Sequence, residues 1–238
     1  MRKRLLLISN STSHGSGYLD HCEGEMRDFL GPVRRVLFLP FALQDRDAYA
    51  AKARGRLKRM GFECESLHDA ATPSAAVERA EAFFAGGGNT FRLLKALYDG
   101  GLLAPLQRRA EAGIPYVGTS AGSNVACMTI QTTNDMPIVQ PESFEALSLV
   151  PFNINLHYLD PDPASAHQGE TREERIREFH EENEPPVVGL REGAMLRIEG
   201  ASVVLKGTAG ARIFRRGRGP EEAAPGASLD FLLESDAP

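Results

Sequence analysis

Short apolar runs alternate with longer amphipathic segments through the first half of the chain. The apolar runs predict buried strands at Arg4–Ser9, Arg35–Pro40, Phe62–Leu67, Ala82–Ala85 and Ile114–Val117. The segments between them predict helices at Tyr18–Leu30, Asp45–Met60, Pro73–Ala80, Thr90–Leu97 and Ala104–Ala112. Strands that are apolar on both faces and separated by helices are typical of an α/β fold. We expect a mostly parallel sheet with helices on both of its faces.

The second half of the chain is less regular. A strongly charged segment, Thr171–Glu182, predicts an exposed helix. Four β-like runs separated by glycines then predict a C-terminal β-meander on the same domain: Val187–Leu190, Met195–Ile198, Ser202–Leu205 and Arg212–Phe214. The Gly-, Pro- and Ala-rich stretch from Gly217 predicts a loosely ordered tail, with Leu229–Leu233 as a candidate edge strand. We therefore expect one domain over residues 1–216 and a tail over residues 217–238.

Composition excludes several classes of protein. The chain has 238 residues, 42% of them hydrophobic and 25% charged, which is enough to form a core without disulfide bonds. Its net charge of −5 argues against a nucleic-acid partner, because phosphate binding needs clustered positive charge. The apolar run Leu5–Ile8 is too short for a signal peptide or a membrane span. Three scattered cysteines fit a reducing compartment, so we expect a cytoplasmic protein without a membrane partner.

The segment Gly118-Thr119-Ser120-Ala121-Gly122 carries the strongest chemical signal. It follows the predicted strand Ile114–Val117 and precedes the helix-compatible run Ser123–Met128. A G-x-S-x-G sequence between a strand and a helix is a nucleophile elbow, which presents its serine at the end of the strand. The N–H groups of the following helix suit a developing oxyanion. A small-residue turn without a catalytic role is the alternative, and the strand–turn–helix setting favours the nucleophile.

A serine nucleophile needs a base, and histidine is the usual one. The chain has six histidines, at His14, His21, His68, His157, His167 and His180. His157 follows a half-apolar run among polar residues and comes after Ser120 in the chain, so the local pattern favours it modestly over His167. His14 is a weaker candidate, and a solvated helix face explains His21 and His180.

The base in turn needs a carboxylate that orients it, and two candidates stay open on the local pattern. Glu192 stands at the end of the predicted strand Val187–Leu190 and precedes a glycine. Asp135 lies in a polar loop that is close to Ser120 in sequence. Either carboxylate also fits a turn residue that caps local backbone N–H groups.

A second glycine cluster, Gly86-Gly87-Gly88-Asn89-Thr90, links a predicted strand to a predicted helix. Glycines let a backbone approach a ligand closely, but this cluster has neither the spacing nor the lysine of a phosphate-binding loop. We interpret a backbone N–H near Gly88 as an oxyanion-hole donor that partners the N–H of Ala121. A helix entry with Thr90 as its N-cap is compatible with that role. No metal-binding motif is present, and we expect no cofactor.

Several segments together resemble the peptidase E (aspartyl dipeptidase) family. They are Leu7–Thr12, Gly86–Phe91, Gly118–Asn124, Thr132–Ile138, Gly169–Ile176 and Gly189–Gly193. The resemblance extends from about residue 5 to about residue 214. It implies a fold like that of class I glutamine amidotransferases, with the chain order serine, histidine, glutamate. It assigns Ser120 as nucleophile, His157 as base and Glu192 as the orienting carboxylate, with Asp135 as the rival third member.

The resemblance also implies a substrate, since peptidase E releases the N-terminal aspartate of Asp-X dipeptides. Arg172 is the candidate cation for the side-chain carboxylate, and Asn89 and Asn10 are candidate substrate-binding residues. Short Asp-X peptides are then the expected partners of a monomer or homodimer. Thr119 stands where the family commonly has a bulky aromatic residue, which predicts a wider pocket above Ser120 and is similar to cyanophycinases. A β-aspartyl isopeptidase and a non-catalytic binding module are the alternative functions.

Overall fold

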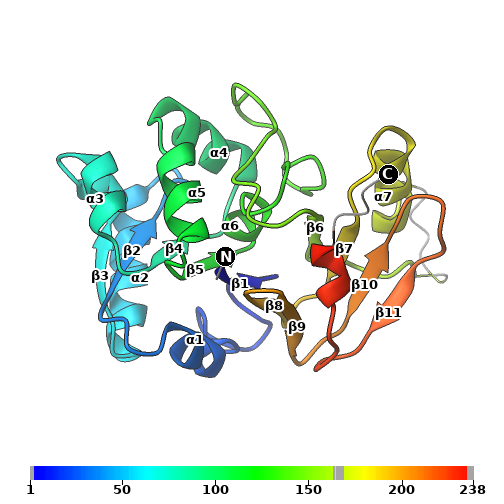
Figure 1. Cartoon of the computed structure of the whole chain (residues 1–238), viewed down its shortest axis with the longest axis horizontal. Coiled ribbons are helices and arrows are strands. Elements are labelled where there is room, and N and C mark those ends of the chain that lie inside the picture. The colour runs from blue at the N-terminus through cyan, green and yellow to red at the C-terminus, as the bar shows by residue number, and fades with distance from the viewer. Residues whose placement is uncertain (1–2, 163, 165–168, 235–238) are drawn as a thin grey trace.

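Two β-sheets organise the protein (Figure 1). The computed structural model describes residues 3–162, 164 and 169–234, so that His167 lies outside the described residues. In this part of the chain, the larger sheet has seven strands in the order β3-β2-β4-β5-β1-β8-β9. The smaller sheet has four strands in the order β11-β10-β7-β6. The two sheets lie side by side in Figure 1, with β8 and β9 next to the smaller sheet.

The parallel part of the larger sheet confirms the predicted α/β fold. Its strands are β1 (Arg4–Ile8), β2 (Arg35–Leu39), β3 (Glu63–Ser66), β4 (Phe83–Ala85) and β5 (Tyr116–Thr119), followed after β3 by the 3-10 turn η1 (Leu67–Asp69). Leu5 and Leu7 point into one buried cluster and Leu6 and Ile8 into the other, because side chains alternate along a strand. Both faces of β1 are therefore buried.

Helices cover both faces of this sheet, as predicted. The helices α1 (Glu23–Leu30) and α2 (Arg46–Arg59) pack on one face. The helices α3 (Pro73–Arg79), α4 (Thr90–Asp99), α5 (Leu103–Glu111) and the single turn α6 (Ala121–Asn124) pack on the other. None of the described helices is both long enough and apolar enough to cross a membrane.

The predicted β-meander is wrong. The strands β7 (Val187–Leu190), β8 (Ala194–Glu199), β9 (Ser202–Gly207) and β10 (Ala211–Phe214) form, but they are divided between the two sheets. Strands β8 and β9 form a hairpin whose first strand pairs antiparallel with β1, and β7 pairs with β10 instead. The reason is the burial of β1, whose backbone groups need partners on both sides; β5 supplies one side and β8 the other.

The smaller sheet uses two strands that the pattern did not predict. Strand β6 (Asn153–Leu156) runs parallel to β7, and β11 (Glu221–Ala223) pairs antiparallel with β10. Helix α7 (Arg172–Glu182) covers the sheet by packing Ile176 into a cluster with Tyr158, Val187 and Phe214. The main buried cluster contains residues of both sheets, so the sheets share a core.

The expectation of a loosely ordered tail is also wrong for the described residues. Strand β11 lies in the predicted tail and completes the smaller sheet. The predicted edge strand Leu229–Leu233 is instead the 3-10 turn η2 (Asp230–Leu233), which begins after the Leu229 N–H donates to the Val203 carbonyl at 2.8 Å. The division of the chain into a domain and a tail stays a prediction.

Candidate active site

Strand β5 ends in the tight turn that the G-x-S-x-G pattern predicts. Ser120 has a φ of +48°, a left-handed conformation that is costly for a residue with a side chain, and its N–H donates to the Ile8 carbonyl at 3.0 Å. A Cβ atom on Gly122 would lie 2.0 Å from the Ala85 carbonyl oxygen, and one on Gly118 would lie 2.6 Å from Gly122 backbone atoms. Only glycine fits at either position, which explains the small residues around the serine.

The structure brings Ser120, His157 and Glu192 into one hydrogen-bonded chain. Ser120 Oγ lies 3.0 Å from His157 Nε2, and His157 Nδ1 lies 2.8 Å from Glu192 Oε1. An ionised carboxylate can only accept, so Nδ1 carries the proton and Nε2 is left to accept the serine hydroxyl. This arrangement has the geometry of a nucleophile, a base and an orienting acid.

The three side chains come from the ends of strands in two sheets. Ser120 follows β5 in the larger sheet, whereas His157 follows β6 and Glu192 follows β7 in the smaller one. Strands β6 and β7 are parallel neighbours, so their carboxyl ends place His157 beside Glu192. His157 has a φ of +52°, a second left-handed residue at the same site.

The rival carboxylate Asp135 does not reach the histidine. Its Oδ2 accepts hydrogen bonds from the Thr90 backbone N–H at 2.7 Å and from the Thr90 hydroxyl at 2.6 Å. Asp135 therefore holds the first turn of α4, which follows the glycine cluster. Of the two carboxylates that the sequence left open, only Glu192 contacts His157.

The glycine cluster lies against the serine. A Cβ atom on Gly87 would be 3.1 Å from Ser120 Cβ, and one on Gly88 would be 2.7 Å from the Ala42 carbonyl oxygen. Gly88 also has a φ of +135°, which other residues rarely adopt. Neither the Gly88 nor the Ala121 N–H donates a hydrogen bond to another described residue. No described residue takes up either N–H group, which is compatible with the predicted oxyanion hole.

The amide of Asn89 is occupied by the protein. Its Oδ1 accepts from the Arg92 N–H at 3.0 Å, which makes Asn89, and not Thr90, the N-cap of α4. Its Nδ2 donates to the Met136 carbonyl at 2.8 Å. One N–H of Nδ2 is left without a partner among the described residues, and substrate binding by Asn89 stays a prediction.

Both polar atoms of the Asn10 amide have hydrogen-bond partners in the protein, and the residue is 1% exposed. Its Oδ1 accepts from the Gly193 N–H at 2.8 Å, and its Nδ2 donates to the Thr12 carbonyl at 3.1 Å and the Ser13 hydroxyl at 3.0 Å. Asn10 lies beside the candidate triad, but the structure does not leave its side chain open to a substrate.

Arg172 is a cation without a carboxylate partner among the described residues. It stands in the first turn of α7, where its Nη1 donates to Asn134 Oδ1 at 2.6 Å. Burial, reinforced by the nearby Arg175, lowers the pKa of Arg172. Asn134 Nδ2 donates to the Leu156 carbonyl at 2.7 Å, so one side chain links Arg172 to the residue before His157.

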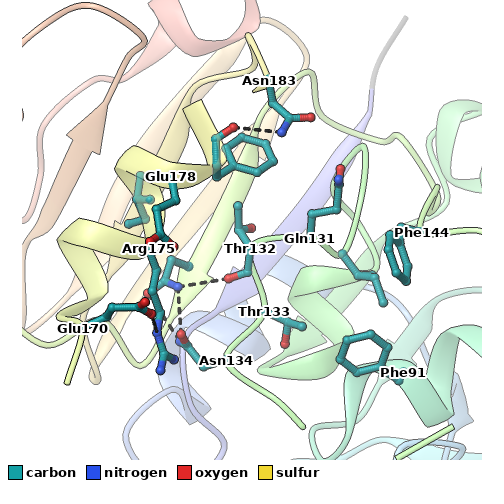
Figure 2. A pocket seen from close by; sticks show the side chains of 14 residues that line it. Phe91, Gln131, Thr132, Thr133, Asn134, Phe144, Glu170, Arg175, Glu178 and Asn183 are labelled. Carbon is teal, nitrogen blue, oxygen red and sulfur yellow. Dashed lines mark hydrogen bonds and ion pairs between the residues drawn. The ribbon is translucent and has the colours of Figure 1, made fainter. Parts of the chain in front are cut away.

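Two cavities meet at Asn134. One, of about 520 Å³, lies between α7 and the segment 130–134, with Phe91 and Phe144 on the wall opposite Arg175 (Figure 2). The other, of about 550 Å³, is lined by Arg172 together with Leu159 and other residues near the start of α7. The three triad residues line neither cavity.

The remaining histidines correct the sequence interpretation. His180 is buried, at 8% exposure, and its Nε2 lies 3.0 Å from the Pro185 carbonyl, so it does not lie on a solvated face. Both ring nitrogens of His21 are buried without a hydrogen-bond partner among the described residues. Burial lowers the pKa of His21, and the charges of Asp20 and Glu192 oppose that shift. We predicted a helix that includes His21, but His21 lies in a turn just before α1.

One group of side chains has metal-ligand types, although the sequence spacing did not indicate it. His68 Nε2 lies 3.0 Å from Asp47 Oδ1 and 3.1 Å from Asp69 Oδ1. The group is at the end of β3, and β2 and β4 separate that strand from β5. Arg54 also pairs with Asp69, so an ion-pair cluster accounts for these residues without a metal.

The side chain of Thr119 is fully buried at the end of β5, with a hydroxyl that has no hydrogen-bond partner among the described residues. The wider pocket above Ser120 stays a prediction.

Comparisons with known proteins agree on one family. A model of peptidase family S51 matches residues 5–206. The chain is 54% identical to "Peptidase E" of Streptomyces coelicolor over 230 residues, 97% of this chain and 95% of that one. It is 50% identical to the "Probable alpha-aspartyl dipeptidase" of Drosophila melanogaster, with 98% of each chain covered. A solved peptidase from an acI-B1 actinobacterium shares the fold, with a TM-score of 0.72 at 18% identity over 96% of this chain and 97% of that one.

Proposed function

Since this chain belongs to peptidase family S51, we propose that it is an α-aspartyl dipeptidase, which hydrolyses Asp-X dipeptides after their N-terminal aspartate. The observation that carries the proposal is the hydrogen-bonded chain of Ser120, His157 and Glu192. Relatives that are 50% and 54% identical over nearly the whole chain bear the names of this activity.

In the first step, His157 Nε2 takes the proton of the Ser120 hydroxyl as Oγ attacks the carbonyl carbon of the Asp-X bond. The carbonyl oxygen becomes an oxyanion, and the N–H groups of Gly88 and Ala121 stabilise it. The C–N bond then breaks, His157 returns the proton to the leaving amine, and X departs as a free amino acid. Glu192 stabilises the imidazolium that forms between these two transfers.

In the second step, a water molecule enters the place that X has left. His157 takes a proton from the water while the water oxygen attacks the carbonyl carbon of the aspartyl ester on Ser120. The ester bond breaks, the proton returns to Ser120 Oγ, and free aspartate leaves. All atoms come from the peptide and the water, and the protein returns to its starting state.

Arg172 is our candidate for recognition of the substrate's side-chain carboxylate. A guanidinium that makes no ion pair within the described chain is favourable for an acidic ligand, because binding needs no existing ion pair to break. Its bond to Asn134 leaves the other guanidinium N–H groups for a bidentate contact.

We make three further proposals, about the partners, the oligomeric state and the compartment of the protein. The partners are short Asp-X peptides, and neither nucleic acid nor a membrane surface takes part. The protein acts as a monomer or a homodimer. Its compartment is the cytoplasm, with which three free cysteines, at Cys22, Cys64 and Cys127, are compatible.

The test is the release of free aspartate from Asp-Leu, β-Asp-Leu and Asn-Leu by the wild type and by Ser120→Ala. We expect cleavage of Asp-Leu alone, and a loss of turnover on the order of a millionfold in the variant at an unchanged melting temperature. Cleavage of β-Asp-Leu instead would replace the proposal with a β-aspartyl isopeptidase. Full activity of Ser120→Ala would remove the nucleophile, and no cleavage of any peptide would favour a binding module.

A further inference from the structure

Three consecutive residues at the carboxyl end of β1 bond to the backbone at, or next to, the three members of the candidate triad. They are Ile8, Ser9 and Asn10, and each bonds to a different member's segment. Strand β1 is the one strand that pairs with both β5 and β8, so it lies at the inner part of the larger sheet.

Ile8 holds the nucleophile. Its carbonyl oxygen accepts from the Ser120 N–H at 3.0 Å and from the Ser123 hydroxyl at 2.9 Å. These bonds continue the pairing of β1 with β5 beyond the end of the ladder, and they fix the turn in which Ser120 takes its left-handed conformation.

Ser9 joins the larger sheet to the base. Its hydroxyl oxygen accepts from the His157 N–H at 3.1 Å and donates its proton to the Leu190 carbonyl at 2.8 Å. Leu190 is the last residue of β7, and His157 follows β6. One hydroxyl, 0% exposed, therefore bonds to both strand ends that carry the base and the acid.

Asn10 joins the larger sheet to the acid. Its Oδ1 accepts from the N–H of Gly193, the residue after Glu192, at 2.8 Å. Its Nδ2 donates to Thr12 and Ser13, so the side chain is held in one orientation from both ends. At 1% exposure this amide is shielded from solvent and lies where a misplaced polar group would be costly.

We propose that Ser9 and Asn10 are positioning residues, which set the distance between the nucleophile of one sheet and the base and acid of the other. The proposal rests on the proposed function. The two sheets share no backbone ladder among the described strands, so nothing in the regular pairing aligns β5 with β6 and β7. The side-chain bonds of Ser9 and Asn10 cross that boundary at the point where the 3.0 Å contact between Ser120 and His157 must form.

Alignment at this level matters for rate. A displacement of about 1 Å at a reacting group costs on the order of a hundredfold in turnover. His157 also has a φ of +52°, a sparsely populated conformation that the surrounding hydrogen bonds must hold, so the loss of the acceptor at its N–H lets the backbone relax away from Ser120.

The test measures Ser9→Ala and Asn10→Ala against matched controls far from the triad contacts. Ser66→Ala removes another buried hydroxyl, at the outer strand β3, and Asn153→Ala removes a buried amide that bonds to Thr129. For each variant we would record kcat and KM for Asp-Leu, the melting temperature, and the rate at which a fluorophosphonate labels Ser120.

We expect Ser9→Ala to lower kcat and the labelling rate by about tenfold to a hundredfold with KM nearly unchanged, and Asn10→Ala to do the same more weakly. The controls should lose melting temperature to a similar extent and keep kcat. A folded Ser9→Ala protein that is labelled at the wild-type rate would overturn the proposal. The proposal would also be overturned if kcat fell in proportion to the melting temperature in the controls and in Ser9→Ala alike.

The labelling rate separates this proposal from the proposed function. A wild type that is labelled at Ser120 but releases no aspartate would contradict the substrate, while the variant series would still test the alignment. A wild type that is not labelled would contradict the nucleophile itself.

Discussion

The two sheets contribute different halves of the candidate site, and they do so by different means. The larger sheet supplies Ser120 and the N–H donors from turns that directly follow β4 and β5. The smaller sheet supplies His157, which lies 37 residues after Ser120 in the chain, and Glu192, which lies 35 residues after His157. The nucleophile therefore depends on local geometry, and the base and acid depend on how two sheets are held together.

This difference shows which part of the site is sensitive to single substitutions. The turn at Ser120 is enforced by two glycines whose neighbours leave no room for a Cβ atom. The side chains of His157 and Glu192, by contrast, are 40% and 51% exposed and are held by hydrogen bonds that single substitutions can remove. Substitutions at His157 and Glu192 should therefore change the rate without unfolding the protein.

The largest effect is expected at the acid of the smaller sheet. Glu192→Gln keeps the shape of the side chain but lets it donate to Nδ1, which favours the wrong histidine tautomer. Since Glu192 is half exposed, water partly replaces it, and we expect kcat to fall by about a hundredfold to ten-thousandfold. Steady-state kinetics with Asp-Leu and a melting curve would measure this. An unchanged kcat would mean that the carboxylate does not orient the base.

A smaller effect is expected at Arg172, the cation on helix α7, which covers the smaller sheet. Arg172→Ala removes the proposed partner of the substrate carboxylate, so KM for Asp-Leu should rise by about tenfold to a hundredfold. The melting temperature should change little, because Arg172 makes one side-chain bond and no ion pair with the described residues. Arg175→Ala, on the same helix, is the control. Equal changes in KM for the two variants would exclude a specific role for Arg172.

A third substitution, at Asp135, tests the glycine loop that follows β4 of the larger sheet. Asp135→Ala removes the one oxygen that accepts from both the N–H and the hydroxyl of the fully buried Thr90, which should cost about 1–3 kcal/mol of the free energy of unfolding. The glycine loop before Thr90 then loses support, and we expect kcat to fall by about tenfold or less. Urea unfolding and kinetics measure the two quantities. A loss as large as that of Glu192→Gln would restore Asp135 as a member of the triad.

The smallest effect is expected at Asp160, in the loop after His157. Hydrogen bonds from Arg191 lower the pKa of Asp160 below its ordinary value of 3.8. The ionised form is favoured by folding, so its stabilisation is complete above the unfolded pKa and is lost as the pH falls through the folded pKa. Because Asp160 is half exposed, Asp160→Asn should cost less than about 1 kcal/mol.

Urea unfolding of the wild type and Asp160→Asn at pH 7 and at about pH 3 checks that expectation. The difference between the two proteins should shrink at the lower pH. A difference that stays constant between the two conditions would mean that the charge of Asp160 is not what stabilises the loop.

The sequence pattern was most informative where structure is local. The five parallel strands, the helices of both faces and the turn at Ser120 all follow from apolar runs and from one short motif. The strand β6 was missed because Asn153 and Asn155 interrupt its apolar pattern, and both are buried with their amides bonded to Thr129 and to Thr132 and Asn134. Buried polar residues are invisible to a hydrophobic pattern when their partners are distant in the chain.

The candidate site divides in the same way. Ser120 was identified from its own neighbours, but the choice between Glu192 and Asp135 needed the resemblance to a family, and the structure then brought only Glu192 to His157. Asn10 and Asn89 were predicted to bind substrate. In the structure their amides bond to Gly193 and Met136, which no local pattern could indicate.

The sequence by itself determined the parallel sheet, the helices that cover it and the serine turn, because periodicity and glycine sterics act over a few residues. The tertiary structure alone decided that β8 pairs with β1, that the last strands form a second sheet, and that Ser9 and Asn10 bond to the strand ends behind His157 and Glu192. The contacts of β1 with β8, of Ser9 with His157 and of Asn10 with Gly193 join residues more than 140 positions apart in the chain. They follow from the need to satisfy buried backbone groups, which depends on the whole fold.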